Sequence, residues 1–135
     1  MIRGAREADY DAYARLFREL GFDDATPSYE RWTRELARGT LVADRAGTVE
    51  GYVDFYALRD AGHIRNVVVS PAARNSGLGA ELMRAAADQL RAGGISEWYL
   101  NVKQSNTAAI RLYEAIGFTP RRTTTFRLVR IPDQA

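Results

Sequence analysis

The chain of 135 residues contains no cysteine, a single histidine, His63, and a single lysine, Lys103. The lack of cysteine excludes disulfide bonds, metal sites built on thiolates and a covalent acyl intermediate on sulfur. One histidine without any cysteine leaves no cluster of ligands for a catalytic metal. The sequence therefore predicts chemistry that relies on oxygen and nitrogen groups and uses no metal.

Long apolar segments are also absent, since no run approaches the ~20 residues that a membrane span needs. The first residues, Met1 to Arg6, do not have the pattern of a signal peptide. The length and the hydrophobic content of 46% fit one compact domain. We therefore expect a single domain over residues 1–135, located in the cytoplasm and without a membrane partner.

Excess charge is small, at a net +2, and almost all of the positive charge comes from arginines spread along the chain. A charge this small and dispersed does not indicate a nucleic-acid partner. It is compatible with a small ligand rich in phosphate, or simply with a solvated surface rich in arginine.

Residues 2–5 have the pattern of a short strand, and two helical segments follow. In the first, apolar residues recur at helical spacing up to Gly21, namely Tyr10, Tyr13, Leu16, Phe17 and Leu20. Thr26 and Pro27 predict the cap and first turn of the second helix, which Gly39 would end. Its core-facing stripe would consist of Tyr29, Trp32 and Leu36.

From Thr40 the period changes to two, which predicts antiparallel strands at 41–43, 49–58 and 64–69. Helical spacing returns at 78–90 with a stop at Gly93 and Gly94, and a strand at 98–102 follows. A last helix, 106–116, ends at Gly117, before a terminal strand at 123–131. This order predicts a mixed sheet with helices on both faces.

The segment from Ser70 to Gly79 leads directly from a strand into a helix. A helix N-terminus exposes unpaired N–H groups and the positive end of the dipole, and Gly77 and Gly79 would let a diphosphate approach the backbone. The pattern predicts a pyrophosphate-binding loop, whereas on its own it is also compatible with glycines that only shape a turn.

Two other phosphate-binding motifs do not fit. A Walker loop needs Gly-Lys followed by Ser or Thr, but Lys103 lies on another strand. A dinucleotide-binding fingerprint needs a glycine where Leu82 stands and begins directly after its strand, whereas Gly77 lies eight residues beyond Val69.

A second segment places Tyr113 seven residues after Asn106. At ~100° per residue the two side chains project from nearly the same side of a helix. The pair could hold an amide and a phenol along one ligand, and for an isolated pair a helix cap and a packing residue would be the simpler explanation.

Together the two segments resemble the acyl-CoA-binding core of the GNAT superfamily of N-acetyltransferases. The first family motif, Arg/Gln-x-x-Gly-x-Gly/Ala, is matched by Arg74, Gly77 and Gly79. The second is matched by Asn106, Ala109, Leu112, Tyr113, Gly117 and Phe118. The resemblance extends from residue 1 to about 131. It implies the α/β acyl-CoA N-acyltransferase fold of the α+β type, with a mixed, mostly antiparallel sheet of six to seven strands and about four helices.

The resemblance also implies an enzyme that moves the acetyl group of acetyl-CoA directly onto a primary amine of a small molecule or peptide. Backbone N–H groups at a strand bulge would bind the thioester carbonyl, near Val67, Val68 and Val69. Backbone groups would bind the pyrophosphate at Arg74, Asn75, Ser76, Gly77, Leu78, Gly79 and Ala80. Asn106 would bond the pantetheine arm, and Tyr113 would protonate the departing thiolate.

Two departures from the family pattern concern the general base and the C-terminal region. The usual carboxylate positions hold Arg65, Asn66 and Asn101. A water chain or one of three side chains, His63, Asp54 and Glu97, could remove the proton instead. Since only Thr119 to Ala135 follow the second motif, we expect the last hairpin to be shortened or missing. That would open the acceptor groove or leave a sheet edge for a second subunit of a homodimer.

The missing base also keeps a rival function open, a GNAT fold that binds acetyl-CoA as a sensor or scaffold without turnover. Retention of Tyr113 favours the enzyme.

Overall fold

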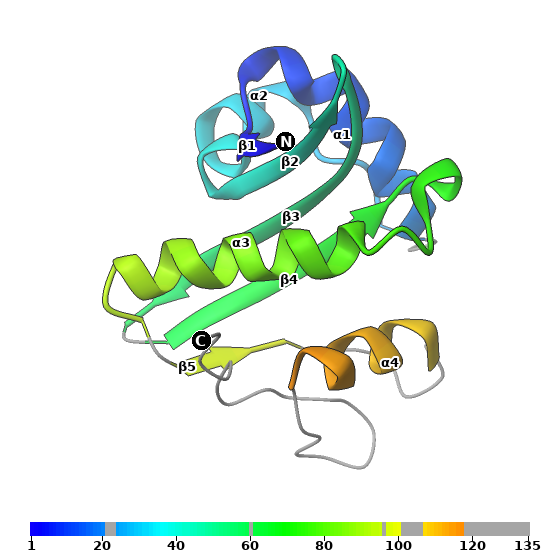
Figure 1. Cartoon of the computed structure of the whole chain (residues 1–135). Coiled ribbons are helices and arrows are strands. Elements are labelled where there is room, and N and C mark those ends of the chain that lie inside the picture. Colours follow the sequence, from blue (N-terminus) through cyan, green and yellow to red (C-terminus); the bar gives the residue numbers. More distant parts are fainter. Residues whose placement is uncertain (21–23, 60, 96, 101–106, 118–135) are drawn as a thin grey trace. The chain divides into compact units, whose positions relative to one another are not determined.

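The computed structural model describes residues 1–20, 24–59, 61–95, 97–100 and 107–117 (Figure 1). The chain forms two compact units. The first consists of Met1–Asp54 and Asn66–Ala86, and the second of Phe55–Arg65 and Ala87–Ala135. Two strands and one helix have residues in both units, so the predicted single domain remains a prediction.

Five described strands form one sheet in the order β1-β2-β3-β4-β5. Their bounds are β1 Ile2–Gly4, β2 Thr40–Arg45, β3 Thr48–Leu58, β4 Ala61–Val69 and β5 Glu97–Tyr99. β2 pairs antiparallel with both β1 and β3, and β5 pairs parallel with β4. The predicted mixed, mostly antiparallel sheet is confirmed, although the described residues contain five strands rather than six or seven. The predicted strand 123–131 lies outside the described residues.

The first two helices, α1 and α2, adjoin irregular turns. α1 (Tyr10–Phe17) lies between the 3-10 turns Glu7–Asp9 and Arg18–Leu20. α2 (Tyr29–Arg31) continues as a π-helix, Trp32–Leu36, and a 3-10 turn, Ala37–Gly39. The predicted end at Gly39 is confirmed, but the predicted cap at Thr26 and Pro27 is wrong. Ser28 caps the helix instead, because its Oγ accepts a hydrogen bond from the Arg31 N–H at 3.1 Å.

The core of the first unit is built on aromatic rings from both helices and from β3. The Tyr13 ring stacks on Trp32 with centroids 4.4 Å apart and tilts against Tyr52 at 4.9 Å. The whole buried cluster consists of Tyr13, Leu16, Trp32, Leu36, Val42, Val49, Tyr52 and Val68. Two of the three residues of the predicted α2 stripe are thus in the core. Tyr29 is not, because Ser28 makes it the first helical residue, and it is 52% exposed with its ring edge-on to Tyr10.

The second unit contains the last part of α3 (Leu78–Ala92), β5 and α4 (Thr107–Ile116). Gly62 in β4 lies so close to this layer that an added Cβ would be 3.1 Å from both Leu90 Cδ1 and Trp98 Cε3. Trp98 and Leu90 are accordingly buried. The predicted helix ends at Gly93 and Gly117 are confirmed by the bounds of α3 and α4. Within the described part of the chain, no helix has the length and apolar character to cross a membrane.

Candidate functional site

The end of β4 is fixed against β3 inside the first unit. The Ser70 N–H donates to the Glu50 carbonyl oxygen at 2.8 Å, and the Ser70 hydroxyl donates to the Glu50 carboxylate. A Cβ on Gly51 would be 2.8 Å from the Val68 carbonyl oxygen, so the two backbones approach closely. Val68 is buried, whereas Val67 and Val69 are partly exposed. Their predicted role in binding a thioester carbonyl remains a prediction.

The loop after β4 bends the backbone sharply into α3. A 3-10 turn, Pro71–Ala73, is followed by Asn75 and Gly77, both in the left-handed region with φ of +64° and +82°. No heavy atom lies within 4 Å of a Cβ placed on Gly77, so its backbone conformation, not crowding, favours glycine there. Alternating left-handed residues turn backbone N–H groups toward one side, as in anion-binding nests. Residues 74–77 are all exposed.

α3 begins directly after this loop, with the Glu81 N–H donating to the Gly77 carbonyl oxygen at 3.1 Å. Leu78 is buried and anchors the first turn, while Gly79 and Ala80 are partly exposed. The first N–H groups of a helix have no intrahelical partner, and the helix dipole favours an anion there. The predicted residues Arg74 to Ala80 thus form one segment, exposed at residues 74–77, whose backbone N–H groups are suited to bind an anion.

Side chains hold this loop in shape from within and from outside. The Ser76 hydroxyl donates to the Ala73 carbonyl oxygen, and Arg74 Nε donates to the Val69 carbonyl oxygen at 3.3 Å. From outside the loop, Arg45 Nη2 donates to Ser76 Oγ at 3.4 Å. Sequence analysis did not identify Arg45, since a single arginine at a hairpin carries no motif.

The predicted acid, Tyr113, belongs to α4 in the second unit. It is buried, and burial raises the pKa of its phenol to about 12 because the charged phenolate is disfavoured away from water. The phenol is therefore protonated at neutral pH. Asn106, predicted to project from the same side of the helix, lies outside the described residues, so the pairing of the two stays a prediction.

The candidates for the general base differ strongly in environment. Asp54 in β3 is buried, at 2% exposed, and Glu97 at the start of β5 is exposed. His63 is partly exposed and lies within a row of rings in the second unit. Its imidazole stacks on Tyr56 with centroids 5.0 Å apart and 9° between planes, and it tilts against Tyr99 at 5.5 Å.

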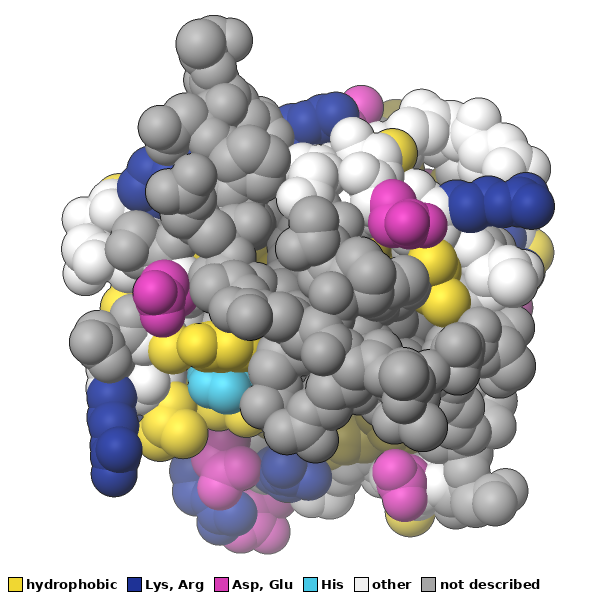
Figure 2. Space-filling view, turned by 90° about the horizontal axis from the view of Figure 1, so that it is seen from below, with side chains coloured by type: hydrophobic (Ala, Val, Ile, Leu, Met, Phe, Trp, Pro, Cys, Tyr) yellow, Lys and Arg dark blue, Asp and Glu magenta, His cyan; other side chains and the backbone are white. Residues whose placement is uncertain are grey.

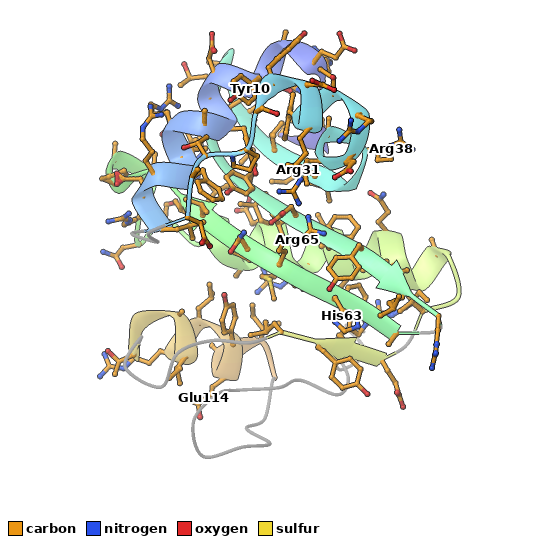
Figure 3. The ribbon with its side chains drawn as sticks, turned by 180° about the vertical axis from the view of Figure 1, so that it is seen from behind. Tyr10, Arg31, Arg38, His63, Arg65 and Glu114 are labelled. Atoms are coloured by element: carbon orange, nitrogen blue, oxygen red, sulfur yellow. The ribbon has the colours of Figure 1, made fainter. Side chains whose placement is uncertain are left out.

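The histidine side chain reaches the surface with hydrophobic side chains on both sides of it (Figure 2). No hydrogen bond to either ring nitrogen occurs among the described residues, so stacking alone orients the imidazole. Arg65, which follows on β4, places its guanidinium carbon 4.7 Å from the centre of the Tyr56 ring (Figure 3). The β4 and β5 register, which sets His63 opposite Tyr99, creates this grouping. Asn101 lies outside the described residues.

Metal chemistry finds no support in the described residues, since they contain no group of three or more His, Cys, Asp or Glu side chains suited to hold an ion.

Comparison with known sequences gives one family and two kinds of relative. The pattern of the acetyltransferase (GNAT) family matches residues 6–118. A mycothiol acetyltransferase of Thermobispora bispora is 39% identical over 88 residues, which make up 60% of this chain and 30% of the relative. A [ribosomal protein bS18]-alanine N-acetyltransferase of Haemophilus ducreyi is 43% identical over 61 residues, 45% of this chain and 42% of the relative. The chain thus matches less than half the length of either relative.

Solved structures extend the similarity in fold to the whole chain. Ard1 of Thermoplasma volcanium superposes with a TM-score of 0.86 at 23% identity, covering 99% of this chain and 98% of the other. The protein yncA of Salmonella typhimurium, solved with its cofactor acetyl-CoA, superposes with a TM-score of 0.78 at 23% identity, covering 100% and 95%. At these identities the similarity establishes the fold.

Proposed function

The chain belongs to the acetyltransferase (GNAT) family, and from this premise we propose that it transfers the acetyl group of acetyl-CoA to a primary amine. The observation that carries the proposal is the exposed segment from Arg74 to Ala80. Its left-handed residues, its open space beside Gly77 and the start of α3 fit a diphosphate bound by backbone N–H groups. The same segment carries the family's first motif.

The steps of the transfer are assigned to residues by the resemblance of the two sequence motifs to the family. Backbone N–H groups of residues 67–69 would stabilise the negative charge that develops on the thioester oxygen as the amine nitrogen attacks. The new C–N bond forms as the C–S bond breaks, and the sulfur leaves as a thiolate. The amine nitrogen gives up one proton to the general base, for which His63, Asp54, Glu97 and a water chain are the candidates. Tyr113, whose phenol is protonated at neutral pH, gives its proton to that sulfur. Asn106 would hold the pantetheine arm.

The names of the two relatives indicate two classes of acceptor. One relative is named for mycothiol, a small molecule, and the other for the alanine of a ribosomal protein. Both names are consistent with the proposed acceptor, a primary amine of a small molecule or of a peptide.

A second candidate function is a module that binds acetyl-CoA without turnover. The observation that favours it is the absence of a carboxylate at the family's usual base positions, where the chain has Arg65, Asn66 and Asn101.

One experiment separates the two functions. Release of free CoA thiol from acetyl-CoA is followed across amino acids, polyamines, aminoglycosides and peptides. A peptide that begins with alanine is paired with the same peptide already acetylated at its N-terminus. Thiol release that depends on a free amine supports the enzyme. Calorimetric binding of acetyl-CoA without release for any acceptor supports the binding module, and lack of binding contradicts both.

A further inference from the structure

Arg45, at the end of β2, touches the candidate phosphate-binding loop from a distant part of the chain. Its Nη2 lies 3.4 Å from Ser76 Oγ, a contact between residues 31 positions apart. The β2–β3 turn that follows, with Ala46 and Gly47 at positive φ, places the arginine at this edge of the first unit. The contact is long for a hydrogen bond, so it holds the guanidinium only weakly.

Carboxylates do not neutralise Arg45 in the described part of the chain. Its neighbour Asp44 has both oxygens engaged, since Oδ2 accepts from Arg3 Nε at 3.1 Å and Oδ1 from the Gly47 N–H at 2.8 Å. Glu50 accepts from the Ser70 hydroxyl. Other arginines do pair with carboxylates, among them Arg3, Arg31, Arg34 and Arg91.

Two guanidinium groups therefore adjoin the loop, from different elements. Arg74 comes from the loop itself and has its Nε on the Val69 carbonyl oxygen. Arg45 comes from the hairpin and keeps most of its donors for another partner, because its hydrogen bond within the described part of the chain is to a neutral hydroxyl. Glu81 in the first turn of α3 is the acidic group on the helix side.

We propose that Arg45 binds a phosphate group of the acetyl-CoA held by this loop. The inference rests on the proposed function, and it adds a residue that lies outside both family motifs. The guanidinium is always charged and presents a planar fork that matches phosphate oxygens. Ser76, whose proton goes to Ala73, holds Arg45 beside Gly77, where the diphosphate would meet the backbone. The phosphate is one of the diphosphate or the 3′-phosphate of the nucleoside.

The test uses Arg45→Gln and a matched control, Arg38→Gln. Both arginines are exposed and both lie in the first unit. Arg45 is the last residue of β2, whereas Arg38, labelled in Figure 3, belongs to the turn before this strand. Each substitution removes one positive charge, so a general effect of net charge would appear in both. Calorimetry measures the dissociation constants of CoA and of 3′-dephospho-CoA for the whole chain and for each variant.

We expect Arg45→Gln to weaken CoA binding about 10- to 150-fold, the range of one charge-assisted hydrogen bond, while Arg38→Gln leaves it within about twofold. An equal loss for both ligands identifies the diphosphate, and a loss confined to CoA identifies the 3′-phosphate. If the wild-type chain binds CoA and Arg45→Gln binds it equally well, the inference is wrong and the proposed function stands. If the wild-type chain does not bind CoA, the proposed function itself fails.

Discussion

Arg3 and Asp9 form a two-bond ion pair, in which Nη1 donates to Oδ2 at 2.8 Å and Nη2 donates to Oδ1 at 3.0 Å. Arg3 lies on β1 and Asp9 precedes α1, and Arg3 Nε also donates to Asp44 on β2. Asp9 Oδ2 accepts a further hydrogen bond from the Arg6 N–H at 2.8 Å. With Asp9 buried, the pair joins β1, β2 and the start of α1.

This pair predicts a specific dependence of stability on pH. The hydrogen bonds from Arg3 lower the pKa of Asp9 below its ordinary value, against the opposing effect of burial. A carboxylate with a depressed pKa stabilises the fold above the unfolded pKa of ~3.9 and loses that contribution as the pH falls through the folded value. Asp9→Asn should lower the free energy of unfolding at pH 7 by about 1–3 kcal/mol.

Urea denaturation at pH 7 and at pH 3 checks this prediction. The difference in the free energy of unfolding between wild type and Asp9→Asn should be smaller at pH 3 than at pH 7. Glu35→Gln is the control, because the Arg31–Glu35 pair is about half exposed and such pairs contribute about 0–1 kcal/mol. If the difference in the free energy of unfolding is the same at both pH values, the ion pair of Asp9 does not stabilise the fold in the way proposed.

Gly51 predicts how closely β3 must approach the end of β4. A Cβ there would lie 2.8 Å from the Val68 carbonyl oxygen and 3.1 Å from Leu82 Cδ1. The backbone oxygen cannot move away without displacing β4. Gly51→Ala should therefore lower the free energy of unfolding by about 1–3 kcal/mol and weaken acetyl-CoA binding. Gly4→Ala, which meets no atom within 4 Å, should stay within about 0.5 kcal/mol. Equal stability of Gly51→Ala and Gly4→Ala would show that β3 and β4 have room for a side chain at residue 51.

Gly77 predicts a loss of ligand binding that exceeds the loss of stability. Its φ of +82° and open surroundings are shared by Gly94, which follows α3 at φ +88°. Alanine at either site should cost about 1 kcal/mol of stability for the left-handed conformation. Only Gly77→Ala should weaken acetyl-CoA binding, by about tenfold or more, equivalent to about 1.4 kcal/mol. Calorimetry and thermal denaturation of both variants measure the two effects, and unchanged affinity in Gly77→Ala would remove the loop assignment.

Local sequence patterns predicted the elements that depend on local forces. The spacing of Tyr13 and Leu16, and of Trp32 and Leu36, identified core faces because buried helices repeat every 3.6 residues. The helix start was wrong because Thr26 and Ser28 are both good caps, and the spacing of apolar residues does not decide between them.

The sequence analysis did not predict contacts between residues that are far apart in the chain. Arg45 meets Ser76 only because the hairpin lies beside the loop, and no local pattern encodes that contact. His63 faces Tyr99 only through the register of β4 and β5, which depends on the crossover through α3. The position of the loop before α3 was predictable because a helix N-terminus with glycines has its own local signal, while the binding role of Arg74 to Ala80 stays a prediction.

We propose His63 as the general base among the candidates. Its ring nitrogens have no hydrogen-bond partner among the described residues, and it is partly exposed, so it can take a proton from an amine or through water. His63→Gln should lower kcat/KM at least tenfold, or about 1.4 kcal/mol of transition-state stabilisation, while Glu97→Gln, on the exposed start of β5, should leave it within about twofold. Steady-state kinetics with the best acceptor measures both. Asp54 or a water chain would take over the assignment if His63→Gln retained full activity.

Tyr113→Phe gives the sharpest test of the mechanism. The substitution removes the proposed proton donor and keeps the ring that is buried in the second unit, so fold and acetyl-CoA affinity should survive. General acids contribute about 10²–10⁴ in rate, and kcat should fall within that range, or less if water donates instead. Because the pKa of Tyr113 is about 12, its own ionisation should leave the pH–rate profile unchanged up to about pH 10.

The loss of rate in Tyr113→Phe should appear in kcat and kcat/KM together, since the interaction is made in the transition state. Wild-type turnover by a folded Tyr113→Phe would make Tyr113 a packing residue, and the acid would then have to be another group. The binding-module alternative forecasts something different: the wild-type chain releases no thiol with any amine, and Tyr113→Phe alters only how tightly acetyl-CoA is held.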